Sequence, residues 1–252
     1  MEKCQYDELK AQQEIHWWFT GKREIVLDFA ETHAGLKKNS DVSILDVGCG
    51  MGLMLDSLVE YGNVSGMDME SEAVDYCKEN AIKKGNNIDV RKGSLPNEVP
   101  FDKETFDYIF ALDVIEHVKN DVRALMKLYS LLKPSGKLIL TVPALMNMWS
   151  YNDELNHHFR RYEKKELLNK VKRAHFKIIK CSFYNSYLFV PAWIVRKIKN
   201  GLKIETTDVS NNTKNGYSNR ILKWIFTNEK NRLRKGEFKR GVSLIIVCEK
   251  ME

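Results

Sequence analysis

The segment ILDVGCGMG (44–52) constrains the fold of this chain more than any other. An apolar run leads into glycines at Gly48, Gly50 and Gly52, and a helical pattern follows them. Glycine permits positive φ angles and lets the backbone approach a ligand where a Cβ would intrude. A strand that enters a glycine-rich turn and then a helix is typical of a parallel α/β sheet with a ligand at that edge.

Short apolar runs alternate with helical patterns through the middle of the chain. This alternation predicts a doubly wound α/β fold with a parallel sheet and right-handed crossovers. We expect a mostly parallel seven-stranded sheet with an antiparallel last strand. The expected strands are 42–47, 63–68, 89–93, 106–112, 136–143, 175–184 and 242–250. The expected helices between them are 52–60, 71–84, 116–132 and 163–173.

Two segments fall outside this alternation. Residues 1–40 precede the first strand and have a helical pattern, so we expect an N-terminal helical lid. Residues 41–183 and 241–252 are expected to form the central α/β domain, and 184–240 an insertion between strands six and seven. A chain of 252 residues is long enough for one such core with elaborations.

The charges mark the insertion as unusual. Residues 184–240 hold 13 Lys and Arg against 4 Asp and Glu, whereas the rest of the chain holds 27 against 30. Aromatic and aliphatic residues followed by cations occur at 187–203 and again at 220–226. This pattern suits peripheral contact of 187–240 with an anionic lipid surface. A substrate-covering subdomain and a dimer contact fit it equally well.

Several classes of protein are disfavoured by the composition. The N-terminal residues carry charges and no apolar run, so we expect no secretory signal. No run approaches ~18 uncharged apolar residues, which argues against a transmembrane helix. The five cysteines are far apart and form no CxxC pair, so reduced thiols are expected. We therefore expect a cytoplasmic protein, with peripheral contact at the inner membrane face as an option.

Two acidic residues bear on which ligand the glycine turn binds. Asp68 ends the second strand twenty residues after Gly48, where a carboxylate can accept both hydroxyls of an adenosine ribose. A dinucleotide fingerprint needs a third glycine where this chain has Leu53. Asp46, just before the glycines, would repel a pyrophosphate but suits an ammonium group. A tight turn without a ligand is the alternative.

These motifs resemble those of the class I S-adenosylmethionine-dependent methyltransferases. The resemblance runs from LDVGCGMG and GMD (66–68) through KGS (92–94), the region 95–118 and LLKPSGKLILTVP (131–143). It implies a Rossmann-like fold, S-adenosyl-L-methionine as the methyl donor and S-adenosyl-L-homocysteine as the product. It also implies these cofactor contacts: Asp46, Gly48, Cys49, Gly50, Asp68, Met69, Ser94, Leu95, Leu112, Asp113, Val114 and His117.

A narrower resemblance adds a context. HWWFTGKREIV (16–26) and HHFRRYEKKEL (157–167) resemble a bacterial and archaeal subgroup with "HWWF" and "HHRRY" motifs, which is linked to surface-polysaccharide and glycolipid pathways. We interpret the aromatic cluster as a lid that brings Trp18 over the cofactor and pairs Arg23 with the methionine carboxylate. Ordinary core packing of these aromatics is the alternative.

The methyl acceptor is expected beyond the fifth strand, where such a fold opens onto its ligand crevice. Transfer to a hydroxyl benefits from a general base, and His157, His158 and Tyr151 are the catalytic candidates there. The expected substrate contacts are Trp149, Arg160, Arg161 and Tyr162.

Purely structural roles are the alternative for the residues of this loop and for His117. His158 can cap the following helix, the arginines can pair with Asp153 and Glu154, and His117 can pack or cap rather than line a pocket. A metal site of His157, His158 and Asp153 is disfavoured because adjacent histidines in a loop point in different directions, so no metal is expected.

The sequence thus favours a methyltransferase that acts on a small molecule. The expected methyl acceptor is a hydroxyl of a sugar, glycolipid or anionic metabolite. N-methylation of an amino sugar or other small amine and methylation of nucleic acid are the alternatives. Nucleic acid is disfavoured because 112–115 reads LDVI, without the Asn/Asp-Pro-Pro-aromatic or Pro-Cys sequences of base-modifying enzymes. A membrane-docking module that binds the cofactor without turnover is a third class.

Overall fold

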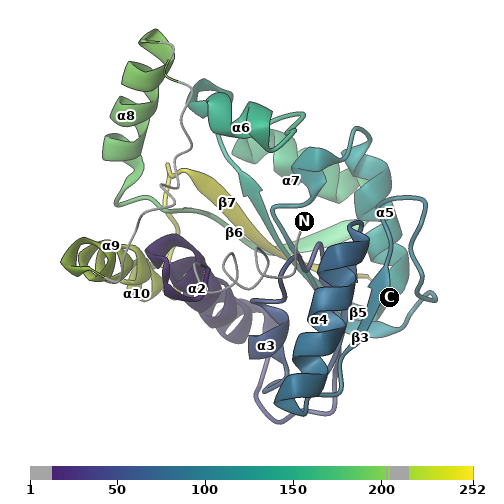
Figure 1. Cartoon of the computed structure of the whole chain (residues 1–252). Coiled ribbons are helices and arrows are strands. Elements are labelled where there is room, and N and C mark those ends of the chain that lie inside the picture. The colour runs from purple at the N-terminus through teal and green to yellow at the C-terminus, as the bar shows by residue number, and fades with distance from the viewer. Residues whose placement is uncertain (1–12, 203, 205–215, 252) are drawn as a thin grey trace.

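The structure is a computed structural model that describes residues 13–202, 204 and 216–251 (Figure 1). Parts of two expected segments therefore lie outside the described residues. These are 1–12 of the N-terminal lid and 203 and 205–215 of the insertion, together with residue 252.

One seven-stranded sheet forms the centre of the fold, in the order β3-β2-β1-β4-β5-β7-β6. All neighbouring strands are parallel except β7, which runs antiparallel to both β5 and β6, and this confirms the predicted fold class. The strands are β1 (Ser43–Val47), β2 (Asn63–Asp68), β3 (Asp89–Lys92), β4 (Phe106–Leu112), β5 (Leu132–Pro143), β6 (Phe176–Tyr184) and β7 (Ser243–Lys250).

Helices cover both faces of this sheet (Figure 1). The α-helices are α2 (Trp17–Ala34), α3 (Leu55–Leu58), α4 (Ser71–Lys84), α5 (Asp121–Leu131), α6 (Tyr151–Leu155), α7 (Lys164–Arg173), α8 (Phe189–Gly201), α9 (Tyr217–Thr227) and α10 (Glu229–Leu233). Helix α4 packs on β2 and β3, and α2 packs on β5, β6 and β7. On the opposite face, α5 and α7 pack on each other and on β5 and β6.

The strand order places a crevice at the carboxyl ends of β1 and β4. These two strands are adjacent and parallel, with Ile44 opposite Tyr108 and Val47 opposite Ala111. The chain leaves β1 toward β2 and β3, but it leaves β4 toward β5, so the crossovers diverge at this point. A doubly wound sheet opens onto its ligand where the crossovers diverge in this way.

Two predicted helices are shorter in the structure than in the sequence prediction. The helix expected over 52–60 is limited to the single turn α3, because Gly50 and Gly52 hold positive φ angles of 51° and 76°. The helix expected over 116–132 begins at Asp121, where Asn120 Oδ1 accepts from the Arg123 amide at 3.1 Å and caps it. A separate 3₁₀ turn, η1 (Ile115–His117), precedes it.

The insertion between β6 and β7 consists of the helices α8, α9 and α10 in the described residues. No residue of α8 is buried, whereas α9 docks on α2 through Phe226, which is fully buried. The Phe226 ring stacks on Trp18 with centroids 5.3 Å apart, and a Cβ at Gly21 would lie 2.7 Å from its Cδ1. None of the helices within the described residues is long and apolar enough to cross a bilayer.

Phe226→Ala is therefore expected to destabilise the fold by about 3–5 kcal/mol, through lost burial and the cavity that remains beside α2. Trp224→Ala on the same helix is the control, because Trp224 is 68% exposed, and should change stability by no more than about 0.5 kcal/mol. Chemical denaturation followed by circular dichroism measures both. Equal losses in the two variants would contradict the docking of α9 on α2.

Candidate functional site

The glycine turn after β1 is held against the end of β2. The Gly48 and Cys49 amides both donate to the Met67 carbonyl oxygen, at 2.7 and 3.1 Å. Gly48 has a φ of 69°, and a Cβ there would lie 2.6 Å from Val114 Cγ2. Gly50 has a φ of 51°, and nothing lies within 4 Å of the place its Cβ would occupy. A ligand can therefore approach the backbone directly at Gly50.

Asp68 closes the turn from the end of β2. Its Oδ2 accepts from the Gly50 amide at 2.8 Å, and its Oδ1 accepts from the Glu70 amide at 3.0 Å. A carboxylate has about four lone-pair sites, so both oxygens can accept a further hydrogen bond. The other expected cofactor contacts lie at the same edge of the sheet, at or just beyond strand ends: Cys49, Met69, Ser94, Leu95, Leu112 and Val114.

A lysine from α2 reaches two carboxyl groups at this edge. Burial raises the pKa of the Asp46 carboxyl to about 8, against the opposing effect of Lys22. Lys22 Nζ donates to Asp113 Oδ2 at 2.6 Å, and Thr141 Oγ1 donates to Asp113 Oδ1 at 2.9 Å. Burial would raise the pKa of Asp113, but Lys22 and Thr141 hold it below its usual value. These contacts also hold Asp113 at a φ of 58°, which is uncommon for a non-glycine residue.

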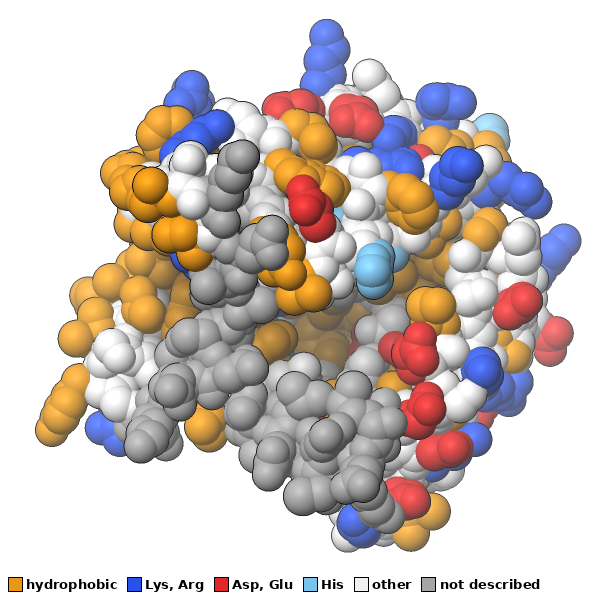
Figure 2. Space-filling view, turned by 45° about the horizontal axis from the view of Figure 1, so that its top comes forward, with side chains coloured by type: hydrophobic (Ala, Val, Ile, Leu, Met, Phe, Trp, Pro, Cys, Tyr) orange, Lys and Arg blue, Asp and Glu red, His pale blue; other side chains and the backbone are white. Residues whose placement is uncertain are grey.

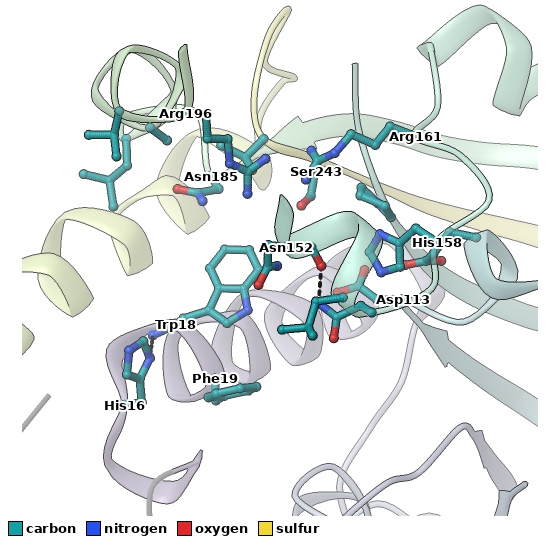
Figure 3. Close-up of a pocket in the computed structure, with 18 of the residues that line it drawn as sticks. His16, Trp18, Phe19, Asp113, Asn152, His158, Arg161, Asn185, Arg196 and Ser243 are labelled. Atoms are coloured by element: carbon teal, nitrogen blue, oxygen red, sulfur yellow. Dashed lines mark hydrogen bonds between the residues drawn. The ribbon is translucent and has the colours of Figure 1, made fainter. Parts of the chain in front are cut away.

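A pocket of about 700 Å³ opens beside this edge, between the start of α2, the α6 region and α8 (Figure 3). Its volume lies in the range of small-molecule sites, ~300–1,000 Å³. Figure 3 shows the Trp18 side chain extending from α2 toward Asn152 and Asp113, with His158 beyond them. Its apolar wall includes Trp17, Trp18, Phe19, Leu188, Pro191 and Val195. Its polar side chains include Asp113, Glu116, His117, Asn152, His158 and Arg161.

Three of these polar side chains form a cluster. One oxygen of Glu116 and one ring nitrogen each of His117 and His158 lie within 4.8 Å of one another, and the two imidazole rings meet edge to face at 4.6 Å. The Phe159 amide donates to the Glu116 carbonyl oxygen at 2.9 Å and so ties the loop after α6 to η1. Burial, and then the Asp113 carboxylate, raise the pKa of Glu116 well above its usual value.

Asp153 fixes the orientation of His158 through the Nδ1 atom of the imidazole ring. Its Oδ1 lies 2.9 Å from His158 Nδ1 and accepts from Arg161 Nε at 2.8 Å. Burial would raise the pKa of Asp153, but His158 and Arg161 lower it to about 2. Asp153 also completes a capping box with Ser150 at the start of α6. The short helix thus holds the carboxylate that fixes the imidazole.

Of the three catalytic candidates in the loop, the structure places one in the pocket lining and two outside it. His158 lines the pocket, whereas His157 and Tyr151 are not among its lining residues. His157 is exposed and has a φ of 55°, in the left-handed region. The predicted catalytic role of His157 and Tyr151 is therefore at odds with the geometry.

Three of the predicted substrate contacts are engaged elsewhere. Tyr162 is fully buried, and its hydroxyl donates to Asp121 Oδ2 at 2.9 Å. The Arg160 guanidinium also pairs with Asp121, at 2.7 Å. Trp149 Nε1 donates to the Glu154 carboxylate at 3.3 Å, outside the pocket lining. Arg161 does line the pocket, although Asp153 Oδ1 accepts from its Nε. Of the alternative pairing of these arginines with Asp153 and Glu154, the Arg161–Asp153 pair is formed, whereas Arg160 pairs with Asp121.

On α2 the sequence prediction selected Arg23, but Lys22 is the residue that reaches the site. Trp18 lines the pocket as expected, and Arg23 does not. Lys22 follows Trp18 by four residues and so lies on the same helix face, which is a signal that the sequence offered. Glu116 was also missed, although a glutamate between Ile115 and His117 in an apolar region is itself unusual.

Other residues that line the pocket have no neighbouring sequence motif that would predict this position. Asn185, Arg196 and Ser243 come from the end of β6, from α8 and from β7, and only the tertiary fold brings them to the pocket (Figure 3).

Comparison with known proteins agrees with this geometry. Residues 45–140 match the sequence model of a family described as "Methyltransferase domain". The chain is 33% identical over 103 residues to the ubiquinone biosynthesis O-methyltransferase of Actinobacillus pleuropneumoniae serotype 7, covering 39% of this chain and 44% of that protein. It is 28% identical over 137 residues to the corresponding protein of Nitrosospira multiformis, covering 50% and 56%. The matches span about half the length of these curated relatives.

Solved structures share the fold over most of the chain. Phosphoethanolamine N-methyltransferase 2 of Haemonchus contortus, in complex with S-adenosyl-L-methionine, has a TM-score of 0.61 at 16% identity, covering 90% of this chain and 52% of that one. Geranyl diphosphate C-methyltransferase of Streptomyces coelicolor A3(2), in complex with S-adenosyl-L-homocysteine, has a TM-score of 0.61 at 13% identity, covering 92% and 80%. Residues 45–140 thus form a methyltransferase domain, on a fold that solved S-adenosylmethionine-dependent methyltransferases share.

Proposed function

We propose that the chain transfers the methyl group of S-adenosylmethionine to a hydroxyl of an amphipathic small molecule. The observation that carries this proposal is the division of the pocket, which has an apolar wall from α2 and α8 and a polar end formed by Glu116, His117 and His158. A ligand with an apolar body and one reacting oxygen matches such a pocket. The donor is already activated, so the protein mainly aligns the two reactants and excludes water.

The donor side of the proposal rests on the glycine turn. The open backbone at Gly50 and the Asp68 carboxylate suit the ribose of the cofactor, as the sequence predicts. The buried Asp46 carboxyl suits the ammonium group of the methionine, because a cation beside it favours the ionised form. We propose that α2 works as a lid over this crevice, since Lys22 anchors it to Asp113 at the end of β4.

On the acceptor side we assign His158 the central role. A hydroxyl must lose its proton as its oxygen attacks the methyl carbon, and an imidazole fixed by a carboxylate is suited to promote that loss. Asp153 fixes His158 in this way, at 2.9 Å. The O-methyltransferase names of the relatives agree with an oxygen acceptor.

The apolar wall of the pocket favours a lipid-like acceptor over the other acceptors that the sequence predicts, a free sugar or an anionic metabolite. A free sugar or small anionic metabolite would leave Trp17, Phe19 and Leu188 against water or polar atoms. A glycolipid or another hydroxyl-bearing lipid would bury them. The arginines foreseen for an anionic group, Arg160 and Arg161, are paired with Asp121 and Asp153.

We further propose that α8 and α9 bring this pocket to an anionic membrane surface. One face of α8 carries Val190, Trp193 and Ile198, which are 38–59% exposed, and another face lines the pocket. Exposed apolar residues also recur at helical spacing on α9, at Ile221 and Trp224. Figure 2 shows hydrophobic side chains gathered at this side of the molecule, next to a hollow. The excess of cations over 184–240 complements anionic lipid.

The test of the reaction is the fate of a labelled methyl group. The protein is incubated with methyl-labelled S-adenosylmethionine and a total cell extract, which is then separated into lipid, water-soluble and nucleic-acid fractions. Label that enters the lipid fraction as an ether supports the proposal. Label in nucleic acid, or in an amine, would support the corresponding alternative and overturn this one.

Asp68→Ala should weaken S-adenosylmethionine binding about 100-fold, because it removes two hydrogen bonds of ~1.5 kcal/mol each to the ribose. Asp75→Ala is the matched control, since Asp75 is an exposed acid on α4 that faces away from the turn. Titration calorimetry measures both affinities. An unchanged affinity in Asp68→Ala would exclude the ribose assignment.

His158→Ala should lower the rate of methyl transfer about 10²-fold or more while leaving cofactor affinity intact. His157→Ala is the control, because the neighbouring imidazole lies outside the pocket. Release of S-adenosylhomocysteine in the presence of the unmethylated lipid fraction gives the rates. Equal effects of the two substitutions would show that neither histidine acts at the acceptor.

Vesicle binding tests the membrane surface. The double substitution Trp193→Glu and Trp224→Glu should abolish co-sedimentation with phosphatidylglycerol vesicles, because each buried indole contributes ~2 kcal/mol or more. Ile82→Glu on α4 is the control, since Ile82 is 78% exposed but lies outside this patch. Loss of a dimer instead of vesicle binding would assign the patch to a second copy of the chain.

A further inference from the structure

The carboxyl group of Glu116 is the least explained polar group of the pocket. Its side chain is fully buried, yet neither of its oxygens has a hydrogen-bond partner among the described residues. An unsatisfied buried acceptor costs about 1–3 kcal/mol, and a charged one costs more. Both oxygens belong to a residue that lines the pocket beside His117 and His158. A group that is absent from the bare chain would satisfy them.

We propose that Glu116, His117 and His158 bind a divalent transition-metal ion such as Zn²⁺ at the reacting end of the acceptor pocket. Donors at ~2.0–2.2 Å from an ion are at most about 4.4 Å apart, so the 4.8 Å spread of the three donor atoms closes with small side-chain movements. Two imidazoles and one carboxylate are a donor set for a catalytic ion with an open position. The sequence prediction of no metal is thereby revised.

The partners around the histidines support this assignment. Asp153 Oδ1 engages Nδ1 of His158, which leaves Nε2 of that ring for an ion. A histidine that binds a metal commonly has its other nitrogen held by a carboxylate or a backbone carbonyl. His117 meets the same condition through the backbone of Asn156. The site that the sequence had considered, with His157 and Asp153 as ligands, is not formed, because His157 is exposed and Asp153 is engaged behind the ring.

The ion extends the proposed function, on which its catalytic role rests. An acceptor hydroxyl in the open position would bind the ion, and its proton would leave to solvent at a lower pKa than that of the free alcohol. The oxygen then forms its bond to the methyl carbon as the carbon–sulfur bond breaks, and the sulfonium leaves as the neutral thioether. His158 promotes proton loss as a ligand of the ion in this scheme, not by taking the proton itself.

Metal binding is tested without any turnover. The full chain is stripped with EDTA and titrated with Co²⁺, whose visible absorption reports a four- or five-coordinate site, and Zn²⁺ should displace it. We expect one equivalent to bind. Glu116→Gln and His117→Ala should each weaken binding by more than the roughly 10–100-fold cost of losing an outer-shell partner. Glu154→Gln is the matched control, being an exposed glutamate outside the cluster.

Folding does not confound the test, because Glu116→Gln keeps the shape of the side chain and removes a buried ionisable group, and circular dichroism verifies it. If the chain does not bind Co²⁺, or if Glu116→Gln binds it with the same affinity as the unsubstituted chain, the proposed metal site is wrong. If methyl transfer survives EDTA but fails in His158→Ala, the metal is rejected and hydroxyl methylation by a histidine base stands. If Co²⁺ binds as expected but no label reaches lipid, the metal site stands and the proposed acceptor is wrong.

Discussion

The ion pair between Lys22 and Asp113 fixes the geometry on which the rest of the site depends. Its 2.6 Å contact joins α2 to the carboxyl end of β4, and α2 otherwise packs on the other half of the sheet. The pair sets the rotation of α2, because Trp18 lies one helical turn before Lys22 and must then face the crevice. Without the lysine, Asp46 and Asp113 would be two neighbouring carboxyl groups without this cation, and Asp113 would lose the contact that lowers its pKa.

Much of the fold could be predicted because its signals are local. Strands such as β1, β4 and β7 are short apolar runs in the sequence. The glycine turn with Asp68 identifies the strand pair at the crevice. The site was harder, since its residues converge from distant segments. His158 and its exposed neighbour His157 are indistinguishable in sequence, and only the backbone conformation between them decides which faces the pocket. The same holds for Arg160 and Tyr162, which meet Asp121 of α5 across some forty residues of chain.

In the proposed site the sheet binds the methyl donor, whereas helices outside the sheet form the wall for the acceptor. This separation lets the acceptor change while the donor side stays the same. The proposed donor edge is built from β1, β2 and β4, with backbone amides and carboxyl groups at fixed strand ends. The proposed acceptor wall comes largely from α2 and α8. Packing of Phe226 on Trp18 holds α2, and hydrogen bonds from Arg196 and Asn200 to the carbonyl oxygens of Met148 and Trp149 hold α8. A change in the insertion would alter the wall while leaving the donor edge intact, which agrees with a family match over residues 45–140, before the insertion.

The position of β7 has a consequence for the order in which the sheet can form during synthesis. Strand β7 lies between β5 and β6, yet it is made after both of them and after the whole insertion. The strands from β1 to β5 can pair as they leave the ribosome, but β6 has no neighbour until Ser243–Lys250 arrives. Until then β5 and β6 present unpaired apolar edges of the kind that recruit other chains. The sheet therefore depends on β7 to cover both of these edges.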